Sequence, residues 1–145
     1  MEAAGHTSVP RWEHFPHEAD MGVRGIGSSL AEAFEQGAIA MTALITDPST
    51  IESRERVTLE CTAPDVELLF AEWLNSLVYE MAVRHMIFGK FAVSIEGDRL
   101  RADAWGERVD ARRHHPAVEV KGATFTGLRV ANESSHWVAQ TVVDV

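Results

Sequence analysis

Apolar residues in one stretch of this sequence recur every three or four positions, and this is the longest regular pattern in the chain. The pattern runs over Leu69, Phe70, Trp73, Leu74, Leu77, Val78 and Met81. Side chains at this spacing share one face of an α-helix. The sequence therefore predicts a long amphipathic helix that ends near His85. We expect Thr62 to cap its start and Pro64 to lie in its first turn.

A second pattern with helical spacing lies earlier in the chain, after Ser29. Its apolar members are Leu30, Ala33, Phe34, Ala38, Met41 and Leu44. Ser29 and Glu32 have the spacing of a capping box, in which each side chain accepts from a backbone N–H of the first turn. A helix is predicted from here to the turn residues Asp47–Pro48–Ser49.

The remaining patterned stretches have the two-residue period of β-strands. The expected strands are 12–15, 21–25, 57–61, 88–95, 99–105, 118–125, 128–130 and 137–143. Gly97–Asp98 has the composition of a two-residue hairpin turn between two of them. Two amphipathic helices packed on one mostly antiparallel β-sheet make an α+β fold, a two-layer sandwich.

Length and composition indicate the class of protein. A chain of 145 residues suits one domain with a single core, and we expect a flexible tail over 1–10 followed by a single domain over 11–145. No apolar run approaches the roughly 18 residues that a membrane span needs. The single cysteine, Cys61, excludes an internal disulfide, which is typical of a reducing cytoplasm. We therefore expect a cytoplasmic protein without membrane contact.

The formal net charge of −9 argues against direct, tight binding to nucleic acid. The one basic cluster consists of Arg108, Arg112, Arg113, His114 and His115 and is interrupted by Asp110. Adjacent side chains usually point apart, so one metal ion rarely binds two neighbouring histidines, and we expect a solvated loop at His114–His115. A protein this acidic that works near RNA would bind a basic protein instead.

The densest polar run of the chain, 14–20, connects the first two expected strands. It contains two histidines and two carboxylates, Glu18 and Asp20. Carboxylate oxygens suit Ca²⁺, Mg²⁺ or Mn²⁺, whereas imidazole favours Zn²⁺. The run lacks the His-Glu-x-x-His spacing of zinc hydrolases. On spacing alone, a solvated loop explains it better than a metal site does.

Asp144 ends the last apolar strand, and Val145 follows it. A side-chain carboxylate, a main-chain carbonyl and a terminal carboxylate would lie close together here, as a compact set of hard oxygens. The alternative is a frayed terminus without a role. Lys121 shares one face of its expected strand with Glu119 and could balance charge at such a site. It could equally form a cross-strand ion pair that contributes less than about 1 kcal/mol.

These motifs, in this order, resemble the archease family over nearly the whole chain. The segment 15–22 is similar to the family's opening His-x-Ala-Asp-x-Gly, 29–34 is similar to the start of its first helix, and 64–75 is similar to its second helix. The block 106–121 and the ending Asp144–Val145 also match in order and spacing. Thr126 departs from the family, because many relatives have a histidine there.

The resemblance implies that the chain is an accessory protein and not an enzyme. Archeases assist the RtcB-type RNA ligase, which joins RNA ends in tRNA splicing and repair, by promoting guanylylation of the ligase and its multiple turnover. By position, Asp20 and Asp144 would be side-chain ligands of a divalent hard cation, with a main-chain or terminal oxygen of Val145. We expect Ca²⁺, with Mg²⁺ and Mn²⁺ as alternatives.

Three further residues take their expected roles from the same resemblance. Lys121, with Glu119 in its motif, would stand near the metal and approach the active site of the ligase. His17 would orient the ligand loop.

Two other functions remain open from the residues themselves. The same carboxylates could activate water in a small metal-dependent hydrolase, although no second motif supplies a clear general base. The chain could also be a chaperone-like protein-binding module without metal. A melting temperature that rises with a divalent ion would argue against the metal-free module, because a ligand of the native state raises stability.

Overall fold

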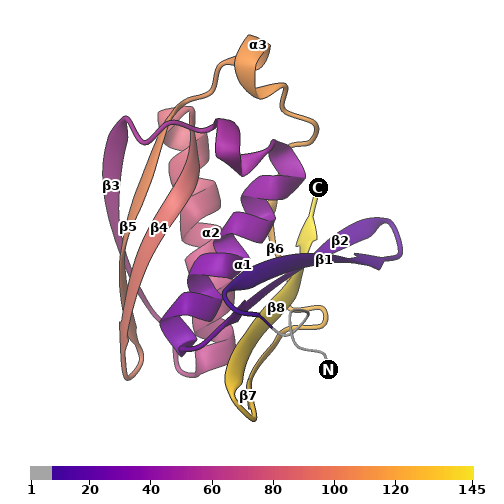
Figure 1. Ribbon diagram of the computed structural model, residues 1–145, viewed down its shortest axis with the longest axis vertical. Helices are drawn as coiled ribbons and strands as arrows, with labels where there is room; N and C mark the ends of the chain where they lie inside the picture. Colours follow the sequence, from indigo (N-terminus) through magenta and orange to yellow (C-terminus); the bar gives the residue numbers. More distant parts are fainter. Residues whose placement is uncertain (1–7) are drawn as a thin grey trace.

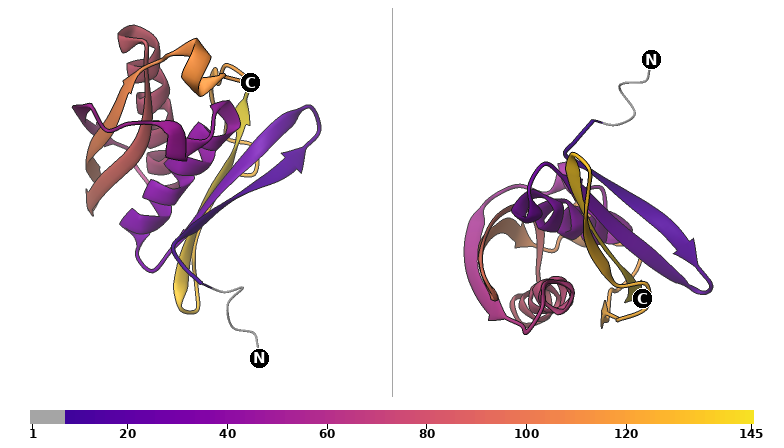
Figure 2. Two further views of the ribbon diagram at one scale, coloured as in Figure 1. Left: turned by 45° about the horizontal axis from the view of Figure 1, so that its top comes forward. Right: turned by 90° about the horizontal axis from the view of Figure 1, so that it is seen from below.

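The strands of residues 8–145, the part of the chain that the computed structural model describes, form two separate antiparallel sheets. The long helices α1 and α2 lie between these sheets (Figures 1 and 2). In chain order the elements are β1 (Arg11–His17), β2 (Asp20–Gly27), α1 (Leu30–Ile45), η2 (Pro48–Thr50), β3 (Glu55–Thr62), α2 (Val66–Arg84), β4 (Met86–Glu96), β5 (Arg99–Arg108), α3 (Ala111–His114), β6 (Gly122–Ala123), β7 (Arg129–Glu133) and β8 (His136–Asp144). The tail predicted over 1–10 falls mostly outside the described residues.

The α+β class is confirmed, but the prediction of one sheet is wrong. The larger sheet has the order β1-β2-β8-β6, with β7 also paired to β8, and the smaller sheet has the order β3-β5-β4. Helix α1 contacts β2 and β8 on one side and β4 on the other. A Cβ atom on Gly25 of β2 would collide with the backbone of α1 at Gly37, so these glycines let strand and helix approach closely.

The first helix begins as predicted. Ser29 accepts a hydrogen bond from the Glu32 N–H at 3.1 Å. The Glu32 carboxylate reaches back to the N–H of Ser28 at 2.7 Å, one residue earlier than in the standard capping box. Helix α1 ends at Ile45, and Asp47 then caps the short η2 helix.

The cap of the second helix is Asp65, so the prediction of Thr62 is wrong. Asp65 accepts from the Leu68 N–H at 2.8 Å. Thr62 remains in β3, where it pairs with Arg99 of β5, and its backbone is therefore already extended. His85 ends the helix in the left-handed conformation with φ 55°, which confirms the predicted end.

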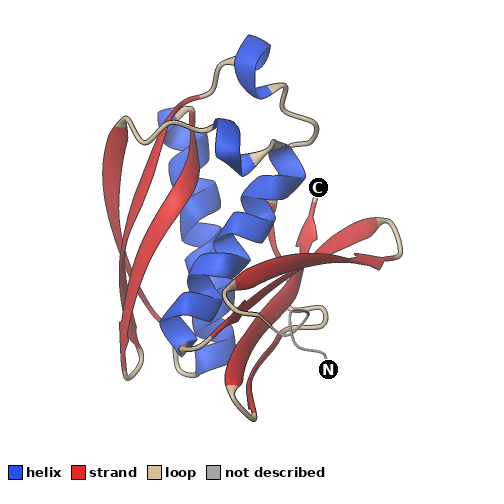
Figure 3. Cartoon of the chain, in the orientation of Figure 1, coloured by secondary structure: helices blue, strands red, loops and turns tan. Residues whose placement is uncertain are grey.

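The strand predicted over 118–125 is wrong, because only Gly122–Ala123 pair in the sheet. Figure 3 shows the preceding residues as a loop. The backbone of this loop is satisfied by other elements: the Ala117 N–H donates to the Ile45 carbonyl at 2.8 Å, and the Lys121 N–H donates to the Asp144 carbonyl at 2.7 Å. The predicted hairpin at Gly97–Asp98 is confirmed, with Gly97 at φ 60°.

The core lies between the helices and the sheets. Trp73 is fully buried, and its indole N–H donates to the Phe34 carbonyl at 3.0 Å, which joins α2 to α1. The rings of Phe34 and Phe70 pack edge to face with centroids 5.0 Å apart. Among residues 8–145, no helix is long and apolar enough to cross a membrane.

Candidate metal-binding site at the end of the larger sheet

The two predicted carboxylate ligands lie at the same end of the larger sheet. Strands β2 and β8 are antiparallel, and their last pair at this end is Met21 with Val143. Asp20 and Asp144 are the next residues along the two strands. Because successive side chains in a strand alternate between faces, both carboxylates belong to the face opposite that of the last pair. The structure thus brings together residues from the two ends of the chain.

A tight hairpin places His17 beside Asp20. These two residues are the last pair of the β1–β2 ladder, and Glu18 in the turn has a φ of 52°. Further along the same face, a Cβ atom on Gly22 would collide with the ring of Phe15. The hairpin is therefore held by an aromatic ring that lies directly on a glycine.

Lys121 is joined to the site through its backbone. Its N–H donates to the Asp144 carbonyl at 2.7 Å, and the next residue, Gly122, pairs with Asp144 in β6. Asp144 is exposed and is part of β8, so the frayed terminus considered above is wrong at this residue. Val145 is partly buried against the core. Lys121 is exposed and precedes β6, and none of the ion pairs within residues 8–145 includes it, so the alternative of a cross-strand ion pair has no support there.

The donor atoms at this sheet end fit a hard cation. Two carboxylates, together with a main-chain or terminal oxygen of Val145, are the ligand type that Ca²⁺ and Mg²⁺ prefer. Within the described part of the chain, no group of three or more His, Cys, Asp or Glu side chains is placed to hold a metal ion. A cation here would therefore depend on main-chain and water oxygens as well as on Asp20 and Asp144, which does not suit a closed zinc site.

A groove of about 420 Å³ lies next to Lys121. Its walls come from the ends of α1 and α2, the start of β4, the segment after β5 and the loop before β6. The lining is mainly apolar and comprises Ile45, Val78, Met81, Ala82, Met86, Ile87, Val109, Pro116, Val118, Glu119, Val120 and Lys121. Glu119, the sixth predicted site residue, is exposed and contributes to this groove, two residues before Lys121.

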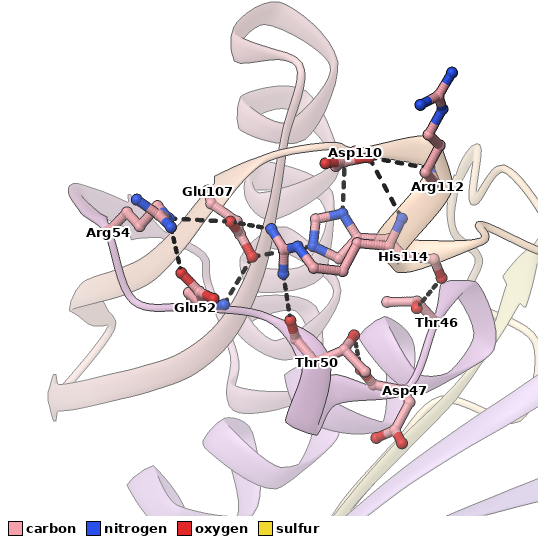
Figure 4. Close-up of polar contacts among 10 residues, drawn as sticks. Thr46, Asp47, Thr50, Glu52, Arg54, Glu107, Asp110, Arg112 and His114 are labelled. Carbon is pink, nitrogen blue, oxygen red and sulfur yellow. Dashed lines mark hydrogen bonds and ion pairs between the residues drawn. The ribbon is translucent and has the colours of Figure 1, made fainter.

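Sequence reasoning missed a buried polar network around Glu107, which Figure 4 shows. Glu107 is 3% exposed and accepts hydrogen bonds from the Arg113 guanidinium at 2.5 Å and from the Glu52 N–H at 2.8 Å. These donors, Arg113 first, lower the pKa of Glu107 to about 2, although burial acts in the opposite direction. Arg54 approaches the same carboxylate at 3.4 Å.

His114 belongs to this network, so the prediction of a solvated loop at His114–His115 is wrong for the first histidine. His114 is 2% exposed, whereas His115 is exposed. The Asp110 N–H donates to Nδ1 of His114 at 2.8 Å, so Nε2 carries the proton and donates to Glu107 at 3.0 Å. The spacing of Asp110 and His114, one helical turn, was the available sequence signal.

Comparison with known proteins decides the family. The model of the Archease protein family matches residues 12–145. Protein archease of Pyrococcus abyssi is 37% identical over 142 residues, an alignment that covers 94% of this chain and 100% of the relative. This chain belongs to the archease family. The archease of Thermococcus gammatolerans is 39% identical over 140 residues, which covers 93% of this chain and 99% of that protein.

Two solved structures share the archease fold described above. The solution structure of protein 1598 from Methanobacterium thermoautotrophicum has a TM-score of 0.81 and 31% identity, and the match covers 92% of this chain and 98% of that one. The crystal structure of an archease from Thermotoga maritima, described as a possible chaperone, has a TM-score of 0.63 at 16% identity. That match covers 99% of this chain and 100% of the other. The resemblance inferred from the motifs is thereby confirmed at the level of the family.

Proposed function

We propose that this archease-family chain activates an RtcB-type RNA ligase by presenting a cation-bearing sheet end to it. The principal support is that Asp20 and Asp144 each lie one residue beyond the last β2–β8 pair at one sheet end, with the Lys121 backbone hydrogen-bonded to Asp144. Asp20, Asp144 and the main-chain oxygens of Val145 would hold the cation, which we take to be Ca²⁺, with Mg²⁺ or Mn²⁺ as alternatives. A bound cation supplies local positive charge in an otherwise acidic protein.

Lys121 gives this surface a second positive group. Its side chain is exposed, and it takes part in none of the ion pairs found within residues 8–145. An exposed ammonium without an ion-pair partner among residues 8–145 is suited to meet a carboxylate or a phosphate of the ligase or its nucleotide. His17, at the hairpin end, would keep Asp20 in place.

The apolar groove beside Lys121 supports a protein partner. Val109 and Val118 line this groove and are 43% and 39% exposed. Exposed apolar surface that adjoins charged residues commonly marks a protein interface. The net charge of −9 favours docking on a basic protein surface and disfavours tight RNA binding by the chain itself. The RNA would accordingly be bound by the ligase.

The test is multiple-turnover ligation of RNA with a 3′-phosphate end to RNA with a 5′-hydroxyl end, with and without the chain. We expect the chain to increase turnover and guanylylation of the ligase, and Asp20→Ala and Asp144→Ala to abolish the increase. Glu96→Ala is the matched control, because it removes one exposed carboxylate from the smaller sheet. Full stimulation by both aspartate variants would refute the site.

The two alternative functions make different predictions in the same experiments. A metal-dependent hydrolase would turn over phosphate or acyl esters without any ligase, and Asp20→Ala would remove that activity. A metal-free chaperone-like module would show no cation-dependent change in melting temperature. The sheet end offers two carboxylates and lacks a cluster of three metal-binding side chains within residues 8–145, which favours binding over water activation.

A further inference from the structure

The residues before Lys121 have little regular structure of their own. Residues 115–121, which we call the strap, connect α3 to β6 and lie outside both sheets (Figure 3). The strap is held near its middle by the bond from the Ala117 N–H to Ile45 and at its end by the bond from the Lys121 N–H to Asp144. The position of Lys121 therefore also depends on how the start of the strap is fixed.

The start of the strap is a helix of four residues, α3. A single helical turn is not stable by itself, because nucleation fixes several residues for few hydrogen bonds. Asp110 caps this turn and accepts from the N–H groups of Arg112 and Arg113 at 3.0 and 3.3 Å. Thr46 at the end of α1 donates its hydroxyl to the His114 carbonyl. The cap and the Thr46 bond still leave the side chains of α3 without an attachment to β5.

Glu107 provides that connection (Figure 4). Its carboxylate, buried at the end of β5, binds two side chains of α3, Arg113 and His114. The same carboxylate accepts from the N–H of Glu52, in the loop that precedes β3. Arg113 also donates to the Thr50 carbonyl at 2.7 Å, so its side chain alone joins α3 to two separate segments. A buried carboxylate is tolerated only with its partners in place, which favours one arrangement of the turn.

We propose that Glu107 is a positioning residue, which acts through Arg113 and His114 to hold the strap and so to keep Lys121 beside Asp144. The consequence for the ligase rests on the function proposed above, but the positional effect does not. When the Glu107 carboxylate is lost, α3 loses its charged attachment to β5. The strap then keeps its two backbone hydrogen bonds, the buried side chain of Val120 and the bond of Thr46 to the His114 carbonyl, and it opens more often because the charged attachment is gone.

Amide hydrogen exchange tests the positional effect without any ligase. Glu107→Gln keeps the side-chain shape and removes the charge. We expect the Ala117 and Lys121 amides to exchange about tenfold faster than in the parent chain, as for the loss of a charge-assisted hydrogen bond. Val57→Ala is the control: Val57 is a buried residue of β3, an edge strand of the smaller sheet, and truncating it lowers global stability elsewhere.

The comparison is made at denaturant concentrations that give both variants the same global stability. Equal exchange at Ala117 and Lys121 in the two variants would overturn the proposal. If Glu107→Gln does not fold, Arg113→Lys replaces it in the exchange experiment. The lysine keeps the positive charge, but its ammonium lacks the planar fork with which Arg113 binds the Glu107 carboxylate and the Thr50 carbonyl at once. We expect the Ala117 and Lys121 amides of Arg113→Lys to exchange faster than in the Val57→Ala control. Equal exchange in the two variants would overturn the proposal.

A double-mutant cycle then tests the route through Lys121. Glu107→Gln should reduce stimulation of ligase turnover in the parent chain and have no further effect in a Lys121→Ala background. If the losses of ligase stimulation in Glu107→Gln and Lys121→Ala add up in the double variant, Glu107 does not act through Lys121. If the parent chain does not stimulate the ligase at all, the proposed function fails, and the exchange result still decides whether Glu107 positions the strap.

Discussion

Acidification should destabilise this chain through Glu107, and the structure gives the size of the effect. The pKa of Glu107 is about 2 in the folded chain, whereas an ordinary glutamate has a pKa of about 4.3. This difference contributes at most about 3 kcal/mol to the free energy of unfolding. The folded-state pKa is the lower one, so the unfolded chain binds more protons as the pH falls. This stability is present above about pH 5 and is lost as the pH approaches 2.

The assay is urea unfolding at several pH values between 6 and 3, for the parent chain and for Glu107→Gln. The variant should be less stable at pH 6, because Arg113 and His114 lose a charged partner. Its stability should also fall less with acid, since the titrating group is gone. Glu96→Gln, an exposed control on the smaller sheet, should keep the parental pH dependence. Identical pH dependence in all three proteins would refute the assigned role of Glu107.

Three further predictions concern the site and the fold. Ca²⁺ should raise the melting temperature of the parent chain in differential scanning fluorimetry but not the melting temperatures of Asp20→Asn and Asp144→Asn. A rise in both variants equal to that of the parent chain would reject the site. Gly22→Ala should lower the free energy of unfolding by about 1–3 kcal/mol, because its Cβ would displace the Phe15 ring; parental stability in urea would contradict this packing. Asp65→Ala should cost about 1 kcal/mol as a lost helix cap, and no loss in the same assay would contradict that assignment.

The local parts of the fold could be predicted from sequence. Both helices follow from apolar spacing, and the β4–β5 hairpin follows from Gly97–Asp98, because these features depend on neighbouring residues only. The division of the strands into two sheets could not be predicted, since alternation shows which side chains share a face and not which strands pair. The glycines at Gly25 and Gly37 mark the close approach of β2 to α1, but only once the two elements are known to be neighbours.

The failed strand at 118–125 has a specific cause. Val118 and Val120 alternate with charged residues, which is the pattern of a half-buried strand. Val120 is 6% exposed, yet Val118 is 39% exposed, so one apolar side chain enters the core and the other remains at the groove. The backbone N–H groups of this segment donate to carbonyls at the end of α1 and at the end of β8. No pattern in the neighbouring residues reveals these distant partners.

The candidate site depends on long-range register in the same way. Asp20 and Asp144 lie at opposite ends of the sequence and share one end of the sheet because β2 and β8 pair, while Lys121 lies at the end of the strap. A different interaction holds each of the three segments. The Phe15 ring packs on Gly22 in the hairpin, β8 is held by its continuous pairing with β2, and the Glu107 network holds the strap. Damage to the ladder or the hairpin should therefore alter cation binding, whereas damage at Glu107 should leave the carboxylates in place and displace the lysine. Cation affinity and ligase stimulation are thus expected to respond differently to these two kinds of variant.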